Sequence, residues 1–207
     1  MSSNGRLYVI SAPSGAGKTS LVTALANLLP DVVVSVSHTT RSMRVGEIDG
    51  KDYFFTTVET FTRMADQGEF LEYAKVFNNF YGTLKSSTQK QLNQGLNVIL
   101  EIDWQGAAQV RARMENSISV FILPPSMTEL EDRLRNRGQD SDEIIARRMR
   151  DARNEISHFN KFDFIILNDD FGHALQELAT LFSSPKTHKP LSKEKLQAII
   201  TELLPNY

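Results

Sequence analysis

The chain has 207 residues, with 23 basic against 25 acidic side chains and a net charge of −2. That length suits one domain with a substantial core, and the charge balance argues against a general nucleic-acid binder, whose binding face would be basic. The sequence contains no cysteine, which excludes disulfides and thiolate metal sites. No apolar run is long enough to cross a membrane. The lack of cysteine fits a reducing cytoplasm, and we expect a cytoplasmic protein.

Short apolar runs rich in Val, Ile and Leu recur along the chain without alternating with polar residues, which is typical of strands buried on both faces. These runs are Leu7–Ser11, Val32–Val36, Val98–Ile102, Ser119–Leu123 and Phe164–Leu167. Helical patterns lie between them. The alternation predicts an α/β fold with a five-stranded, mostly parallel core sheet covered by helices.

The helical patterns have recognisable boundaries. Residues 19–29 place leucines and a valine on one stripe, namely Leu21, Val22, Leu25, Leu28 and Leu29. Ser126 with Glu129 predicts a capping box, opening a helix that ends near Gly138. A second helix with a basic face is expected over Asp142–Phe159.

The C-terminal region reads as a linker followed by an amphipathic helix. Ser183–Leu191 resembles the linker, and the helix carries an apolar stripe at Leu196, Ile199, Ile200 and Leu203. Such a stripe must be buried on the body of the protein or on another subunit. It is therefore also a candidate contact for a homo-oligomer.

Two regions interrupt the strand–helix alternation. Residues 38–86 are dense in Arg, Tyr, Phe and Gly, and we expect an inserted subdomain with short strands of its own. Residues 137–160 are charged and poor in large apolar side chains, the profile of a lid that closes rather than packs into a core. The prediction is one domain, with its core at 1–37, 87–136 and 161–207.

A glycine-rich phosphate loop is the clearest motif. The run from Ser11 to Ser20 fits G-x-x-x-x-G-K-[ST], except that Ala12 replaces the first glycine. Small residues let the backbone N–H groups of such a loop surround an anion at a helix N-terminus. The residues expected to surround the phosphates of a nucleotide in this way are Ala12, Pro13, Ser14, Gly15, Ala16 and Gly17, of which only Pro13 has no N–H to donate. Lys18 would reach the β- and γ-phosphates of a nucleotide, and Thr19 would bind its Mg²⁺. Because alanine avoids positive φ, Ala12 is expected to have a negative φ.

A P-loop alone does not separate kinases from GTPases, and two short matches favour a GTPase. Asp103–Gly106 fits D-x-x-G, and Asn160–Asp163 fits N-K-x-D, a guanine-reading pattern. The second match lacks its context, because it precedes the strand Phe164–Leu167 instead of following a strand. A GTPase therefore remains only a minor alternative.

Several motifs in the inserted region carry a family resemblance. They are Ser37–Glu47 with two arginines three apart, Gly50–Phe54, Phe70–Ala74, Asn79–Thr83 and, beyond the insert, Glu101–Gly106. Together with the phosphate loop, in this order, they resemble guanylate kinases of the bacterial type. The resemblance covers about residues 5 to 180.

The resemblance implies an acceptor site for GMP. Arg41, Arg44, Tyr53 and Tyr81 would bind its phosphate, which suits forked guanidinium groups. Glu72 would read guanine through N1–H and the exocyclic amine, since adenine has no N1–H, with Ser37 and Thr83 on the base edge. Asp103 would lie near the acceptor and the water shell of the metal. Each residue also has a plainer alternative. Arg41 and Arg44 could be surface charges, and Glu72 could lie on a solvated strand face. Tyr53 and Tyr81 could belong to the core of the subdomain, and Asp103 could cap a helix.

The donor side follows from the same resemblance. Arg133, Arg137 and Arg148 would contact phosphates, with Arg137 and Arg148 clamping the transferring group. Asn168 would lie near the donor adenosine, whereas Asp169 or Asp170 could equally cap the next helix.

The implied reaction is Mg²⁺-dependent, direct in-line transfer from ATP to GMP or dGMP. The alternatives are a non-catalytic binding module of guanylate-kinase type, against which Lys18 and Thr19 argue, and a kinase for another nucleotide, against which Glu72 and Ser37 argue. Nucleic acids and membranes are not expected as partners.

Overall fold

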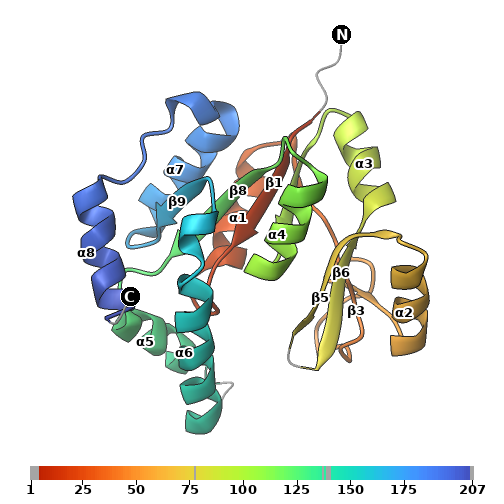
Figure 1. Ribbon diagram of the computed structural model, residues 1–207, viewed down its shortest axis with the longest axis horizontal. Helices are drawn as coiled ribbons and strands as arrows, with labels where there is room; N and C mark the ends of the chain where they lie inside the picture. The colour runs from red at the N-terminus through yellow and green to blue at the C-terminus, as the bar shows by residue number, and fades with distance from the viewer. Residues whose placement is uncertain (1–4, 77, 137, 139–140, 206–207) are drawn as a thin grey trace. The chain divides into compact units, whose positions relative to one another are not determined.

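The computed structural model describes residues 5–76, 78–136, 138 and 141–205 and contains a parallel core sheet (Figure 1). Its strand order is β2-β7-β1-β8-β9. The strands are β1 (Leu7–Ser11), β2 (Val32–Val34), β7 (Asn97–Glu101), β8 (Ile118–Leu123) and β9 (Phe164–Leu167). All five predicted strands are confirmed, although β2 ends two residues early. Every residue of β1 is buried, as its unbroken apolar run predicts.

A second sheet of four strands lies within residues 38–84, in the order β4-β3-β6-β5. It consists of β3 (His38–Thr39), β4 (Phe54–Phe55), β5 (Phe70–Val76) and β6 (Asn79–Leu84). Helix α2 (Val58–Asp66) packs on it, with the ring of Phe61 stacked on that of Phe70 at 4.4 Å between centroids. The short strands expected in the inserted region are therefore present.

Seven helices lie outside the four-stranded sheet region of the described chain. They are α1 (Lys18–Leu28), α3 (Lys85–Asn93), α4 (Trp104–Arg113), α5 (Met127–Asn136), α6 (Asp142–Ile156), α7 (Phe171–Ser183) and α8 (Lys193–Leu203), with 3₁₀ turns η1 (Phe159–Lys161) and η2 (Pro185–Thr187). The stripe on α1 is buried at Leu21, Val22 and Leu25, but Leu28 is 57% exposed. The prediction for Leu28 is wrong because it lies in the last turn, where no other part of the described chain covers it.

Contacts divide the chain into two compact units. The first contains the residues up to Val9 and Asp31–Ile118, and the second contains Ile10–Pro30 and the residues from Ser119 onward. These units differ from the core, insert and lid expected from the sequence, whose boundaries stay a prediction. Among the described residues, no helix has both the length and the hydropathy needed to span a membrane.

In the second unit, α6 packs closely against the body of the unit. Its Ile145, Met149 and Ala152 join Ala16 of the phosphate loop and Leu130 of α5 in one apolar cluster. The prediction that residues 137–160 avoid a core is therefore wrong for α6, because apolar residues spaced three and four apart give it a buried face. The helix is also shorter than predicted, ending at Ile156 instead of Phe159.

Helix α8 confirms the predicted C-terminal stripe and identifies what covers it. Ile199, Ile200 and Leu203 pack with Phe121 of β8 and Leu167 of β9 in a second apolar cluster. The preceding segment is fixed to α7 by His188, whose Nε2 lies 2.9 Å from Oε1 of Glu177. The stripe is thus buried within its own chain, which removes the reason for regarding it as a subunit contact.

Candidate functional site

The phosphate loop joins β1 to α1, as the motif predicts. Gly15 and Gly17 have φ of 96° and 89°, conformations that favour glycine, whereas Ala12 is not among the positive-φ residues. The negative φ expected at Ala12 is confirmed. A turn within the loop is closed by the Ala16 N–H, which donates to the Pro13 carbonyl at 3.0 Å. The loop therefore lies at the N-terminus of α1, the positive end of the helix dipole.

Lys18 and Thr19 form the first turn of α1, where the motif requires them. Lys18 is half-buried and Thr19 is exposed. The first turn of α1 contains no acidic residue, which suits an anionic ligand. The backbone N–H of Ser14 donates at 3.2 Å to the carboxylate of Glu155 on α6, a residue that the sequence did not single out. The Ser14 N–H is thus engaged by a carboxylate from α6.

Asn168 lies directly after β9 and holds the phosphate loop. Its side-chain amide donates to the Ala16 carbonyl at 2.7 Å, and Asn168 is only 4% exposed. A Cβ placed on Gly17 would lie 2.4 Å from Asn168 Nδ2, so these residues fit together without space to spare. The Asn168 carbonyl accepts a bond from Arg133 Nη2 at 3.2 Å. The structure therefore brings Asn168 and Arg133 to the loop, while their contacts with nucleotide stay predictions.

Two further donor-side residues belong to the α5–α6 region. Arg148 is half-buried on α6, one residue before the buried Met149, and Arg137 lies outside the described residues. Ser126 caps α5, accepting from the Glu129 N–H at 3.0 Å. The Glu129 carboxylate instead accepts from Arg133 Nε at 2.9 Å, so the reciprocal half of the predicted capping box is replaced by an ion pair.

In the first unit, Ser37, Thr83 and Glu72 form a hydrogen-bonded chain. Glu72 on β5 faces Thr83 on the neighbouring β6 across the antiparallel pair. The Thr83 hydroxyl donates to Glu72 Oε1 at 2.7 Å and lies 3.3 Å from the Ser37 hydroxyl. The three residues predicted to recognise guanine are therefore gathered at one place. The alternative of a solvated strand face is wrong for Glu72, which is 3% exposed.

Burial dominates the electrostatics of Glu72. Loss of solvation raises the pKa of Glu72 to about 7, with a smaller opposing effect from the Thr83 hydroxyl and a further increase from nearby Asp103. A buried carboxylate with a neutral hydroxyl partner is an energetically costly arrangement. Such perturbed groups gather at functional sites.

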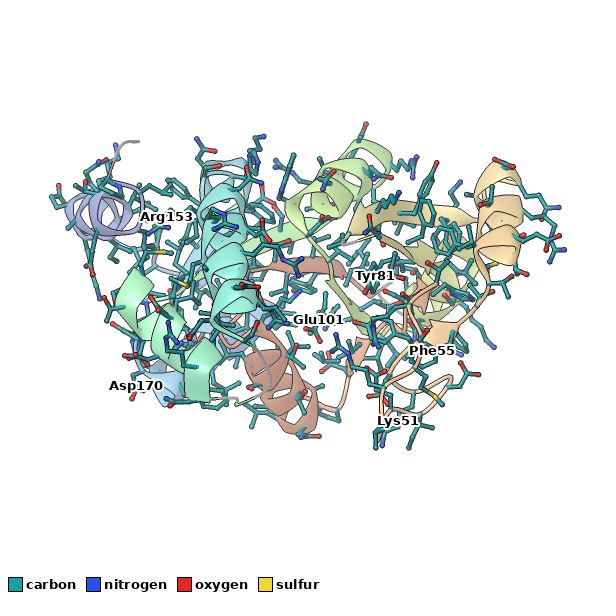
Figure 2. All side chains as sticks on the ribbon, turned by 90° about the horizontal axis from the view of Figure 1, so that it is seen from below. Lys51, Phe55, Tyr81, Glu101, Arg153 and Asp170 are labelled. Atoms are coloured by element: carbon teal, nitrogen blue, oxygen red, sulfur yellow. The ribbon has the colours of Figure 1, made fainter. Side chains whose placement is uncertain are left out.

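Arg41 and two tyrosines form a second group in this unit. Arg41 binds Glu47 in a fork, Nη2 to Oε1 at 2.6 Å and Nη1 to Oε2 at 3.0 Å. Its guanidinium carbon lies 5.4 Å from the ring centre of Tyr53, which contacts the Tyr81 ring at 5.9 Å. Figure 2 labels Tyr81 and Phe55, whose rings both pack edgewise against Tyr53. Tyr53 and Tyr81 thus contribute to subdomain packing as well as facing a cation.

Glu47 fixes the geometry of the arginine pair. One oxygen of Glu47 also accepts the backbone N–H of Arg44 at 2.7 Å. The ion pair lowers the pKa of Glu47 and raises that of Arg41, in each case chiefly through the hydrogen bond between them. The side chain of Arg44 is exposed. Glu47 belongs to the motif read from the sequence, but its acidic charge gave no reason to place it in a phosphate site.

Asp103 has the plainer of its two expected roles in the structure. Its Oδ1 accepts the Gly106 N–H at 2.8 Å and thereby caps α4. Asp170, labelled in Figure 2, likewise caps α7 by accepting the His173 N–H at 2.7 Å. A place near the acceptor nucleotide for Asp103 stays a prediction.

The guanine-reading N-K-x-D alternative is not supported by its surroundings. Asn160 and Lys161 belong to the 3₁₀ turn η1, which precedes β9. The Asp163 carboxylate accepts from the backbone N–H and the hydroxyl of Ser119, at 2.8 and 2.6 Å. Asp163 therefore fastens the beginning of β9 to β8, a structural use that occupies the carboxylate.

The fold and the loop define a P-loop kinase, and comparison with known proteins identifies the family. The guanylate kinase family model matches residues 4–185. Guanylate kinases of Pseudomonas fluorescens and Photobacterium profundum are 54% and 51% identical, each over 98% of both chains. The crystal structure of guanylate kinase from Anaplasma phagocytophilum is 34% identical, with a TM-score of 0.74, covering 99% of this chain and 98% of that chain. This chain belongs to the guanylate kinase family, and its activity is accordingly the phosphorylation of GMP with ATP.

Proposed function

We propose that the chain moves the γ-phosphate of ATP onto GMP, or more weakly dGMP, by direct in-line transfer without a phosphoenzyme. The observation that carries the acceptor assignment is the buried Glu72 carboxylate, with Thr83 and Ser37 beside it. The guanine edge offers two parallel N–H donors, which would satisfy that carboxylate. AMP would leave it unpaired and is disfavoured by several kcal/mol, on the order of 10⁴-fold in rate.

On the acceptor side, Arg41, Arg44, Tyr53 and Tyr81 bind the GMP phosphate in this proposal. The support is the geometry of Arg41, which already holds a carboxylate in a fork at 2.6 and 3.0 Å. A phosphate monoester offers the same pair of acceptor oxygens. No strong base is required, because the GMP phosphate is ionised at neutral pH.

On the donor side, the loop from Ala12 to Gly17 surrounds the phosphates of ATP, and Lys18 contacts the β- and γ-oxygens. Arg133, Arg137 and Arg148 neutralise charge as the phosphoryl group moves, which accounts for most of catalysis in such transfers. The proposed lid, residues 137–160, excludes water that would otherwise accept the phosphate.

Mg²⁺ would be held by the Thr19 hydroxyl together with the nucleotide. Thr19 is exposed in the first turn of α1 next to Lys18, and Mg²⁺ needs few protein oxygens because it keeps several waters and binds phosphates. Within the described residues there is no cluster of three acidic or histidine side chains that could hold an ion independently. When bound, Mg²⁺ supplies charge neutralisation at the phosphates.

The test is a coupled ADP-release assay that compares GMP, AMP, UMP and CMP as acceptors. GMP is expected to be the only good acceptor of the four, and equal rates with AMP would refute the role of Glu72. Lys18→Ala should abolish turnover while GMP binding, measured by calorimetry, is kept. GMP binding without any ADP release by the wild type would instead indicate a non-catalytic binding module.

A further inference from the structure

Gly106 lies against the carboxylate of Glu72. A Cβ placed on Gly106 would lie 2.6 Å from Glu72 Oε2 and 3.3 Å from Glu72 Cδ, closer than ordinary van der Waals contact. Gly106 is buried in the first turn of α4, and Glu72 lies on β5, to which α4 packs. Both residues belong to the same compact unit. The missing side chain is therefore what makes room for the carboxylate.

The local geometry of α4 does not require a glycine at position 106. Gly106 is not among the positive-φ glycines, and alanine is the better helix former. Its N–H caps the helix by donating to Asp103 Oδ1, a bond that any residue except proline could make. The D-x-x-G match therefore has two separate causes. Asp103 caps α4, and Gly106 leaves space for Glu72.

We propose that Gly106 is a positioning residue for guanine specificity, because it sets where the Glu72 carboxylate lies. This inference rests on the proposed role of Glu72 as the guanine reader. Glu72 Oε1 is fixed by Thr83, and the absent side chain of Gly106 lets Oε2 lie against the backbone of α4. Both oxygens are thereby fixed in position, as pairing with two parallel N–H donors requires.

An alanine at position 106 would chiefly displace the Glu72 carboxylate. The other close atom is Ile102 Cδ1, 3.2 Å from the added Cβ and able to yield slightly. Relieving the 2.6 Å approach requires Glu72 Oε2 to move by about 1 Å, a displacement that can cost on the order of 100-fold in rate when reacting groups depend on it. Folding should be affected little, because the end of a side chain moves and the backbone does not.

The experiment is the variant Gly106→Ala, assayed for kcat and KM with both substrates. We expect kcat/KM for GMP to fall about 10- to 100-fold, while KM for ATP changes less than about twofold and Tm stays within about 3 °C of wild type. The preference for GMP over IMP should narrow, because IMP lacks the exocyclic amine that the second carboxylate oxygen meets. A merely structural role would lower Tm and leave that preference unchanged.

Gly172→Ala is the matched control, since Gly172 lies in the first turn of α7 and its added Cβ would make only an ordinary 3.4 Å contact with Asp170 Oδ1. It should leave both KM values unchanged. Glu72→Asp shortens the side chain, so Gly106→Ala should cost less in that background than in wild type. If Glu72→Ala weakens GMP use and Gly106→Ala does not, the inference about Gly106 is overturned. If Glu72→Ala itself leaves GMP use unchanged, the assignment of Glu72 fails instead.

Discussion

The buried Glu72 should make the stability of the protein depend on pH, and Glu72→Gln should remove that dependence. The pKa of Glu72 is raised from 4.5 to about 7 by burial. Because the folded protein holds the proton more tightly than the unfolded chain, the stability this group contributes is present below pH 4.5. It is lost as pH rises through 7. At about 1.36 kcal/mol per pKa unit, the loss between pH 5 and pH 8 is roughly 2 to 3 kcal/mol.

The measurement is urea unfolding at pH 5, 6.5 and 8, followed by the fluorescence of the single tryptophan, Trp104. Trp104 lies in the same compact unit as Glu72 and so reports on its unfolding. The stability of Glu72→Gln relative to wild type should increase by roughly 2 to 3 kcal/mol from pH 5 to pH 8. Glu115→Gln is the control, since Glu115 is exposed in the same unit and should give no such increase. A constant difference between Glu72→Gln and wild type across this range would refute the reasoning.

Further predictions concern both substrates. GMP binding near pH 7 should release protons, because the raised pKa of Glu72 leaves part of that carboxyl group protonated there. Calorimetry in two buffers of different ionisation enthalpy measures this release, and zero release would contradict it. Arg41→Lys should raise KM for GMP about 10- to 100-fold without changing KM for ATP, because an ammonium group cannot reproduce the two parallel hydrogen bonds of a guanidinium. A change of less than about threefold in KM for GMP would count against Arg41 as a phosphate ligand. Asn168→Ala should weaken inhibition by Mg²⁺-tripolyphosphate, which has no base, because the loop loses its 2.7 Å support at Ala16. Unchanged inhibition with weaker ATP binding would place Asn168 at the adenosine instead.

The core sheet was predictable from sequence because unbroken runs of Val, Ile and Leu have few other uses than a doubly covered strand. The phosphate loop was predictable because its chemistry is local, with every atom contributed by consecutive residues. The gathering of Ser37, Glu72 and Thr83 could be expected only through family resemblance. Those residues are separated by 35 and 11 positions. Strand register brings Glu72 and Thr83 together, and the segment leading into β3 brings Ser37 to Thr83.

The features that the sequence did not predict are mostly residues that position other side chains or pack against them. Glu47 was passed over because an acidic group is an unexpected neighbour for a phosphate site, and only the fork on Arg41 shows its purpose. The apolar face of α6 was missed because its apolar residues are interspersed with a larger number of charged residues. Gly106 was noted only as part of the D-x-x-G motif. No sequence pattern shows that the carboxylate of a residue from another element occupies the space that a side chain of Gly106 would need.

The pairing of Arg41 with Glu47 has a consequence for what can enter the acceptor site. A carboxylate tethered six residues away competes at an effective concentration in the millimolar range or above. On the proposed assignment, inorganic phosphate must displace the Glu47 carboxylate, which is tethered to the site. It makes no second contact that would compensate for the cost of this displacement. A nucleotide brings a second attachment through its base and can win that exchange. On that assignment, the acceptor site discriminates against inorganic phosphate and favours a ligand that is bound at both its phosphate and its base.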